Sequence, residues 1–167
     1  MLRWEPPFRV EIETWGGRFG DLAFGPADEF LASERFKALW EQAGLVGLHG
    51  FEPVEIVKVR RRRKRIKEAP PQYFRVWAGH SDVAVDEVRS GLQWVDPPAP
   101  TCEVCRGGGI KKGWERIVLE GEPKENVFFA RGLSGALLAD ERFKRFCDQH
   151  AITNCPLIPA EQASHWF

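Results

Sequence analysis

The sequence predicts an α+β fold, a single compact domain in which duplicated helix-turn-strand units lie around a largely antiparallel sheet. Three observations support this fold: an internal repeat, several short segments of alternating apolar residues, and the absence of a regular βαβ rhythm. The chain has 167 residues, of which 43% are hydrophobic, enough for one ordinary core and too few for two large domains. We therefore expect one domain over residues 1–167.

The internal repeat joins two segments that lie 107 positions apart. Residues 31–42, LASERFKALWEQ, match residues 138–149, LADERFKRFCDQ, at seven of twelve positions. A match of this kind indicates one structural unit that is used twice. We expect the repeat to extend over about 22–57 and 127–163, with a central insert over about 58–120 that holds a hairpin and a CxxC pair.

Both copies have the pattern of a capped amphipathic helix followed by a strand. Ser33 and Asp140 are predicted N-caps, because their side-chain oxygens can accept hydrogen bonds from free amides of the first turn. Gly44 can take the left-handed conformation that ends a helix. The segments GLVGLHGFEPVEI and AITNCPLIPAEQ then resume an alternating apolar pattern. Apolar residues share one predicted helix face in each copy: Phe36, Leu39, Trp40 and Ala43 in the first, and Phe143, Phe146, Cys147 and His150 in the second.

The remaining elements follow from shorter patterns. FRVEIETWGGRF predicts an edge strand and a turn, and residues 52–77 predict a hairpin closed by the turn residues Ala69, Pro70 and Pro71. Ser81 is the predicted N-cap of a short helix with Val85, Val88 and Leu92 on one face. WERIVLE and NVFFA are expected to be strands.

Charge is distributed unevenly, although the net charge is zero. Eight basic residues lie within residues 58–67, and without them the chain has 16 basic and 24 acidic residues, a net charge of −8. The run could bind phosphates, with nearby aromatic side chains stacking on bases, or it could be a solvated arm whose charges deter edge-to-edge sheet pairing. We favour the solvated arm and disfavour a nucleic-acid partner. The basic residues are Lys58, Arg60, Arg61, Arg62, Arg63, Lys64, Arg65 and Lys67, and the aromatic residues are Tyr73, Phe74 and Trp77.

The cellular location is predicted from two features that the sequence does not contain. No apolar run approaches the roughly 20 residues that span a membrane, and MLRWEPPFRVEIE lacks the layout of a secretory signal. We therefore expect no membrane association and a cytoplasmic location. The four cysteines are then reduced thiols or metal ligands instead of disulfides.

Cys102 and Cys105 carry the sharpest chemical signal, because a CxxC pair followed by glycines at 107–109 can form half of a zinc knuckle. A tetrahedral zinc site needs two further ligands. A redox role is an alternative, with Arg106 lowering a thiol pKa, although redox pairs usually precede a helix. Inert turn cysteines are the third alternative. The candidate additional ligands are Cys147, His150, Cys155, His49 and His80.

The repeat argues that the other two cysteines are core residues. Cys147 aligns with Trp40, and Cys155 aligns with Leu48. Since buried cysteine behaves as a small apolar residue, we expect both thiols to be buried, reduced and without a metal. His150 aligns with Ala43, which makes it a core substitution as well.

No set of residues has the spacing of a catalytic site. The sequence contains no HExxH motif, no phosphate-binding Walker loop and no nucleophile elbow, and its four histidines are scattered. We predict no catalytic residue, no enzyme activity and no cofactor other than zinc at Cys102 and Cys105.

Three phrases together resemble the double-CXXCG motif family: LASERFKALWEQAGLVGLHGFEPVEI, PPAPTCEVCRGGG and LLADERFKRFCDQHAITNCPLIPAE. The likeness covers most of residues 20–160. That family is associated with immunity proteins for contact-delivered lipoprotein toxins of social bacteria, the Sit (swarmer-inhibition) type. This chain departs from the motif that names the family, because it has one CxxC pair, with Arg106 at the position of the motif glycine.

The resemblance implies a non-catalytic immunity protein that binds and neutralises a cognate polymorphic toxin in the cytoplasm. A net charge of −8 outside the basic run would suit a cationic toxin. Three alternatives remain open: a nucleic-acid-binding regulator that uses residues 58–67, a small structural zinc-binding protein, and a metal-dependent or thiol enzyme that uses Cys102 and Cys105. Aromatic anchors for a toxin would come from the tryptophans, namely Trp4, Trp15, Trp77, Trp94, Trp114 and Trp166.

Overall fold

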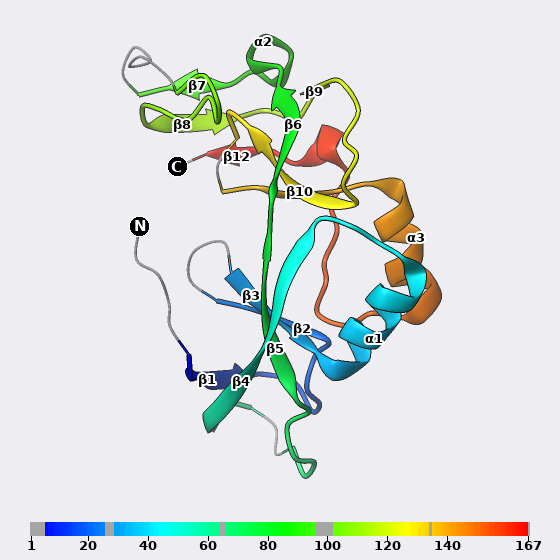
Figure 1. Ribbon diagram of the computed structural model, residues 1–167. Coiled ribbons are helices and arrows are strands. Elements are labelled where there is room, and N and C mark those ends of the chain that lie inside the picture. The colour runs from blue at the N-terminus through cyan, green and yellow to red at the C-terminus, as the bar shows by residue number, and fades with distance from the viewer. Residues whose placement is uncertain (1–5, 26–28, 64–65, 96–101, 134, 167) are drawn as a thin grey trace. The chain divides into compact units, whose positions relative to one another are not determined.

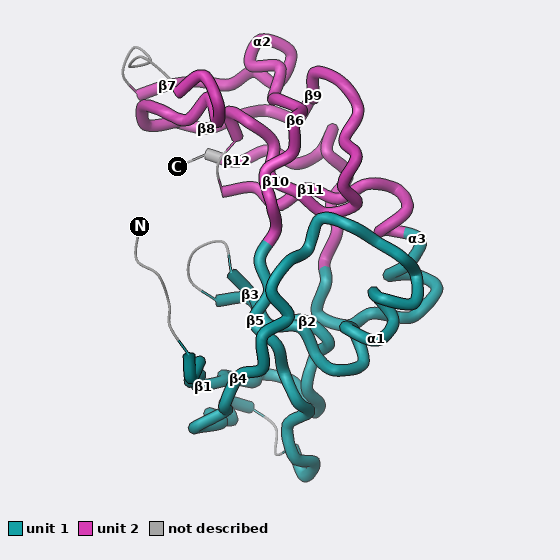
Figure 2. The backbone as a smooth tube through the Cα atoms, viewed as in Figure 1, with its two compact units in different colours: residues 1–77, 145–155 teal, residues 78–144, 156–167 magenta. Residues whose placement is uncertain are grey.

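The computed structural model describes residues 6–25, 29–63, 66–95, 102–133 and 135–166, and it has an α+β fold that is mostly sheet (Figure 1). The chain forms two compact units. The first comprises residues 1–77 and 145–155, and the second comprises residues 78–144 and 156–167 (Figure 2). The α+β class is confirmed, and the expectation of one domain with the boundaries given above stays a prediction.

The first unit holds a five-stranded sheet in the order β1-β4-β5-β3-β2. β1 pairs with β4 in parallel, whereas β3 pairs with β2 and with β5 in antiparallel fashion. The sheet is therefore mixed, not largely antiparallel. As predicted, β1 is an edge strand. The strands are β1 (Phe8–Thr14), β2 (Leu22–Phe24), β3 (Glu29–Ser33), β4 (Leu48–Arg61) and β5 (Tyr73–Ala78).

A small core lies beneath β1 and β4 because their apolar residues alternate. Phe8 and Ile12 of β1 are buried with Val54 of β4 and Tyr73 of β5. Arg9, Glu11 and Glu13 of β1 are exposed and alternate with these positions, as the two-residue period of a strand requires. The sheet therefore has one buried and one solvated face at this edge.

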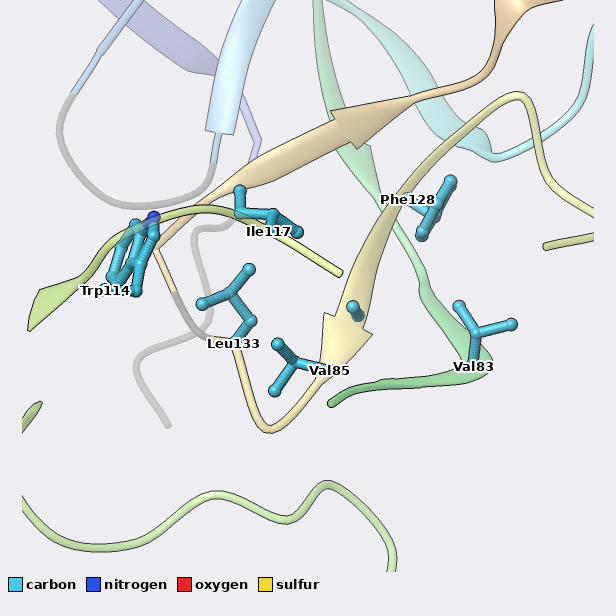
Figure 3. Close-up of a cluster of buried hydrophobic side chains, with 7 residues drawn as sticks. Val83, Val85, Trp114, Ile117, Phe128 and Leu133 are labelled. Carbon is cyan, nitrogen blue, oxygen red and sulfur yellow. The ribbon is translucent and has the colours of Figure 1, made fainter. Parts of the chain in front are cut away.

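The second unit holds two smaller sheets. Strands β11-β10-β6-β9 form one sheet, in which β6 and β10 are parallel, and β12-β8-β7 form the other. Its core contains Val83, Val85, Trp114, Ile117, Phe128, Ala130 and Leu133 (Figure 3). The elements are β6 (His80–Val85), α2 (Glu87–Ser90), β7 (Gln93–Trp94), β8 (Lys111–Trp114), β9 (Leu119–Glu120), β10 (Val127–Arg131), β11 (Leu137–Ala139), the 3-10 helix η1 (Ala160–Gln162) and β12 (His165–Trp166).

The two predicted repeat helices and their N-caps are confirmed. Helix α1 covers Glu34–Ala43 and helix α3 covers Glu141–His150. The Ser33 hydroxyl accepts from the Phe36 N–H at 3.1 Å, and the Asp140 carboxylate accepts from the Phe143 N–H at 2.8 Å. Phe36 and Phe143 are both buried, as expected for the first apolar position of each face.

Both helices also end with the same backbone bonds. In α1, Leu45 N–H donates to the Trp40 carbonyl, and Gly44 takes the left-handed conformation at φ 59°. In α3, Ile152 N–H donates to the Cys147 carbonyl at 2.9 Å, and Ala151 takes the left-handed conformation at φ 47°. Each end is a Schellman motif, although the second has alanine where glycine is favoured.

A buried polar residue precedes the hairpin that leads into each helix. The Asp21 carbonyl accepts from the Ser33 N–H at 2.8 Å, and its carboxylate accepts from the Ser33 hydroxyl at 3.1 Å. The Asn126 carbonyl accepts from the Asp140 N–H at 3.0 Å, and its side-chain amide donates to the Asp140 carboxylate at 2.8 Å. The matched contacts therefore lie on the N-terminal side of each helix.

The strand predicted directly after the second helix, within residues 151–162, does not form. Residues 152–159 are irregular, whereas β4 follows α1. Thr153 and Asn154 hydrogen-bond to Asp21 and Leu22, and Pro156 and Pro159 have no N–H to donate to a ladder. The helix-turn-strand repeat is therefore not confirmed as one duplicated unit.

The prediction that a helix starts at Ser81 is wrong. Residues 80–85 form strand β6, in which Ser81 donates to Glu125 at 2.6 Å. The short helix α2 begins later, where the Asp86 carboxylate accepts from the Arg89 N–H at 2.9 Å. The segment WERIVLE is only partly strand, because β8 ends at Trp114 and β9 begins at Leu119.

Candidate functional site

The predicted CxxC pair lies in a tight turn between β7 and β8. Arg106 N–H donates to the Cys102 carbonyl at 2.7 Å, and Cys102 N–H donates to the Gly107 carbonyl at 3.3 Å. Arg106 takes a left-handed conformation at φ 50°, which turns the chain after the second cysteine. The preceding segment, residues 96–101, lies outside the described residues.

The turn directs hydrogen-bond donors at both sulfur atoms. Gly107 N–H donates to Cys105 Sγ at 3.3 Å. At Cys102, hydrogen bonds from the backbone N–H groups of Cys105 and Val104 lower the pKa of the thiol, with smaller contributions from the Cys105 side chain and Arg131. Cys102 is exposed and Cys105 is half-buried. Hydrogen bonds from the backbone therefore stabilise the thiolate of the exposed sulfur, Cys102.

Arg131 fixes the outer part of this turn. Its guanidinium donates to the carbonyls of Val104 at 2.6 Å and Glu103 at 2.7 Å. The same side chain reaches the Asp82 carbonyl of β6 at 3.3 Å. The turn is thus tied to the sheet by side-chain contacts that the sequence did not indicate.

The fit to zinc is partial, because the turn supplies two of the four ligands that a tetrahedral site requires. Within the part of the chain that the structure describes, no group of three or more potential ligands is found. Zinc at Cys102 and Cys105 therefore stays a prediction. The candidate histidines lie against aromatic rings: His49 near Trp77, His80 near Phe129 and His150 near Phe146.

Cys147 and Cys155 form a second thiol pair, with their sulfur atoms 4.0 Å apart. Cys147 is buried, as predicted, and packs at the C-terminal end of α3. The prediction that Cys155 is buried is wrong, because it is half-buried. Its repeat counterpart Leu48 starts a strand, whereas Cys155 lies in an irregular segment.

The basic run lies at the end of β4, where the glutamates of β1 neutralise part of it. Arg60 and Arg62 donate to Glu11 and Glu13 at 2.7 and 2.8 Å. The hydrogen bond from Arg62 lowers the pKa of Glu13. A third cross-strand pair of this kind joins Arg9 to Glu55 at 2.8 Å. We call this solvated surface the ribbon face: Arg9, Glu11, Glu13 and Trp15 with Glu55, Arg60, Arg62 and Arg63.

An exposed aromatic residue lies at the end of the ribbon face. Trp15 is 57% exposed, and the Arg63 guanidinium lies over its ring, 5.5 Å from the centroid. Glu11 and Glu13 are exposed, and Trp15 follows them at the two-residue spacing of a strand. The alternation along β1 could therefore have predicted that Trp15 is exposed. Lys64 and Arg65 of the predicted run lie outside the described residues.

The three aromatic residues near the basic run contact other residues within the fold. Tyr73 is buried, and its hydroxyl donates to the Gly20 carbonyl at 2.5 Å. Trp77 lies against Arg75, and Phe74 lies beneath Lys37. Among the other predicted anchors, Trp114 is buried and Trp94 contacts Lys111. Trp4 lies outside the described residues, and the Trp166 side chain is not described.

Comparison with known proteins does not assign the chain to a family. No protein-family model matches the sequence, and no curated protein matches it significantly. None of the helices in the described part of the chain is long and apolar enough to cross a membrane.

Proposed function

We propose that this protein is an immunity protein that neutralises a cognate protein toxin by binding it, and that the ribbon face makes the contact. The observation that supports this proposal most strongly is the exposed Trp15, which lies at the end of a surface of alternating charges with the Arg63 guanidinium over its ring. Tryptophan and arginine are the residue types that most often dominate binding energy at protein interfaces. The resemblance in the sequence supplies the class of partner.

The distribution of charge on the ribbon face supports a protein partner over a nucleic acid. Arg60 and Arg62 each face a carboxylate of β1, and a phosphate that approached them would also meet Glu11 and Glu13. A surface that carries both signs is suited to a partner with a complementary pattern. A uniform polyanion lacks such a pattern.

Inhibition by occupancy requires no chemical change in the toxin. Trp15 and Arg63 would be the energetically central residues of the contact, and the paired charges beside them would lie at its rim. Rim charges act mainly on the association rate and on its dependence on salt. We therefore expect association to slow as ionic strength rises, and dissociation to depend on the two central residues.

The test is co-expression with a lipoprotein toxin encoded in the adjacent reading frame, followed by purification of the pair. We expect rescue of growth and a stable complex. Replacement of Trp15 or Arg63 by alanine should weaken the complex at least about tenfold. The matched control is Val88→Ala, because Val88 is 90% exposed on the second unit and should leave affinity unchanged.

Three results would overturn the proposal in whole or in part. Protection without a detectable complex, or with a covalently altered toxin, would indicate an enzyme. Tight binding to a 20-mer oligonucleotide that weakens steeply with salt and is lost in Arg61→Gln/Arg63→Gln would indicate the nucleic-acid regulator. If protection and complex persist unchanged in Trp15→Ala/Arg63→Ala, the toxin contacts another face.

A further inference from the structure

The segment that follows α3 brings two thiols into contact. Cys147 lies in the last turn of α3 and Cys155 lies eight residues later, with their sulfur atoms 4.0 Å apart. Sulfur atoms at this separation touch without a bond. A disulfide bond of about 2.05 Å would require them to approach by about 2 Å.

Contacts within the loop between the two cysteines hold the pair in place. Ile152 N–H donates to the Cys147 carbonyl at 2.9 Å, which folds the chain back over the helix end. Thr153 is bound through its N–H and hydroxyl to Asp21, and the Asn154 amide donates to the Leu22 carbonyl at 2.7 Å. The backbone that carries Cys155 is therefore fixed by partners in β2 and the residue before it.

The two thiols differ in access and in acidity. Cys147 is buried, whereas Cys155 is half-buried. The hydrogen bond from Cys147 lowers the pKa of Cys155, although burial opposes this, and the same bond raises the pKa of Cys147. The thiolate therefore forms first at the sulfur that a reagent can reach.

We propose that Cys147 and Cys155 are a modification site at which a low-molecular-weight disulfide oxidises the pair to an intramolecular disulfide. The Cys155 thiolate attacks one sulfur of the reagent, which forms a mixed disulfide and releases one thiolate. Cys147 then loses its proton and attacks the Cys155 sulfur, which releases the second thiol. Two protein thiols are oxidised, and one reagent disulfide is reduced to two thiols.

The bond would close the turn that carries Thr153 and Asn154. Those two residues hold Asp21 and Leu22, so oxidation fixes the connection between α3 and the start of β2. The site is separate from the ribbon face, and its oxidation is independent of the proposed function. It also differs from the CxxC turn, whose thiols belong to the second unit.

The experiment uses the full chain carrying Cys102→Ser/Cys105→Ser, treated with oxidised glutathione under native conditions. We expect loss of both remaining thiols, no retained glutathione, and a cross-link between the peptides that contain Cys147 and Cys155. Addition of Cys147→Ser should stop the reaction at a glutathione adduct on Cys155. Addition of Cys155→Ser should slow thiol loss at least about tenfold, because Cys147 is buried.

Three outcomes would overturn the proposal: two thiols that persist in the native protein but cross-link in urea, a stable glutathione adduct on Cys155 while Cys147 is present, or equal reaction rates in the two single variants. Circular dichroism of the reduced proteins identifies a variant that fails to fold. In that case Cys147→Ala or Cys155→Ala replaces the corresponding serine variant, because alanine keeps these positions apolar.

Discussion

The carboxylate of Asp21 accepts hydrogen bonds from both the backbone N–H and the hydroxyl of Thr153, at 2.9 and 2.8 Å, across 132 residues of sequence. The same carboxylate accepts from Arg35 at 2.8 Å and from the N-cap Ser33 at 3.1 Å. The Arg35 guanidinium also donates to the His150 carbonyl. One buried carboxylate thus joins the start of α1 to the segment after α3.

Replacement of Asp21 by asparagine should destabilise the protein by about 2 kcal/mol. Charge-assisted bonds to a buried carboxylate are lost, and the NH2 group that replaces one oxygen would face hydrogen-bond donors. Urea unfolding monitored by circular dichroism measures this change. The control Glu68→Gln, at an exposed position, should stay within about 0.5 kcal/mol of the wild type. Equal stability of both variants would show that the carboxylate makes no net contribution.

The contribution of Asp21 should depend on pH in a defined direction. Burial raises the pKa of this carboxyl, but bonds from Thr153 and Arg35 outweigh burial, so its folded pKa lies below the ordinary value of 3.8. A lowered folded pKa adds stability above the unfolded pKa, and that stability is lost as pH falls through the folded pKa. The stability difference between wild type and Asp21→Asn should therefore be constant near neutral pH and shrink below about pH 4. A difference that grows on acidification would contradict this assignment.

The Schellman motifs give a matched pair of substitutions. Ala151→Gly should stabilise the protein by about 0.5–1 kcal/mol, because alanine at φ 47° is strained and glycine is not. Gly44→Ala should destabilise it by a similar amount, since an added Cβ meets no atom within 4 Å and only the conformation is unfavourable. Denaturant midpoints measure both. The two substitutions should change stability in opposite directions. A destabilising Ala151→Gly would show that the left-handed conformation of Ala151 is not strained.

These helix ends show which features the sequence could predict. The caps at Ser33 and Asp140 and the apolar faces depend on residues within one or two turns, so local pattern was sufficient. The prediction of a strand after α3 failed because residues of this segment hydrogen-bond to distant partners such as Asp21. A pattern of neighbouring residues cannot reveal such partners. The prediction of a largely antiparallel sheet failed for a similar reason. Alternation of apolar residues predicts a strand but not which strand lies beside it, and β1 is parallel to β4.

Gly50→Ala should be strongly destabilising, by more than about 2 kcal/mol. A Cβ at this position would lie 2.1 Å from an atom of the Trp77 ring, and φ is +95°. Gly16→Ala is the control, because its nearest contact would be 3.8 Å away. Thermal unfolding followed by tryptophan fluorescence should show a large decrease in Tm for the first and little change for the second. Equal Tm values would show that Trp77 moves freely.

In the candidate sites, too, the sequence predicted the residues but not the contacts that depend on the fold. Cys102 and Cys105 were visible from their spacing, and Arg60 and Arg62 were visible from charge alone. The neutralising role of Glu11 and Glu13 was not, because it depends on the parallel register of β1 with β4. The contact between Cys147 and Cys155 depends on the irregular path after α3, where a strand was expected.

Cys102 should be alkylated faster at neutral pH than an ordinary thiol. Hydrogen bonds from the N–H groups of Cys105 and Val104 lower its pKa, so the midpoint of its reaction with iodoacetamide should lie below that of an ordinary thiol. Mass spectrometry of peptides labelled across a pH series measures this midpoint. Arg131→Met should raise it, whereas Arg89→Met, at another arginine of the second unit, should not. A midpoint at or above the ordinary value would show that the N–H groups do not stabilise the thiolate.

The glutamates of β1 should mask part of the basic run. Because Glu11 and Glu13 pair with Arg60 and Arg62, the double variant Glu11→Gln/Glu13→Gln should release two arginines and elute from heparin at higher salt than the wild type. Arg60→Gln/Arg62→Gln should elute at lower salt. Glu122→Gln/Glu161→Gln is the matched control, since it changes net charge equally at exposed positions of the second unit. If the control shifts as much as Glu11→Gln/Glu13→Gln, heparin affinity reports net charge alone, and the ion pairs of the ribbon face do not mask the basic run.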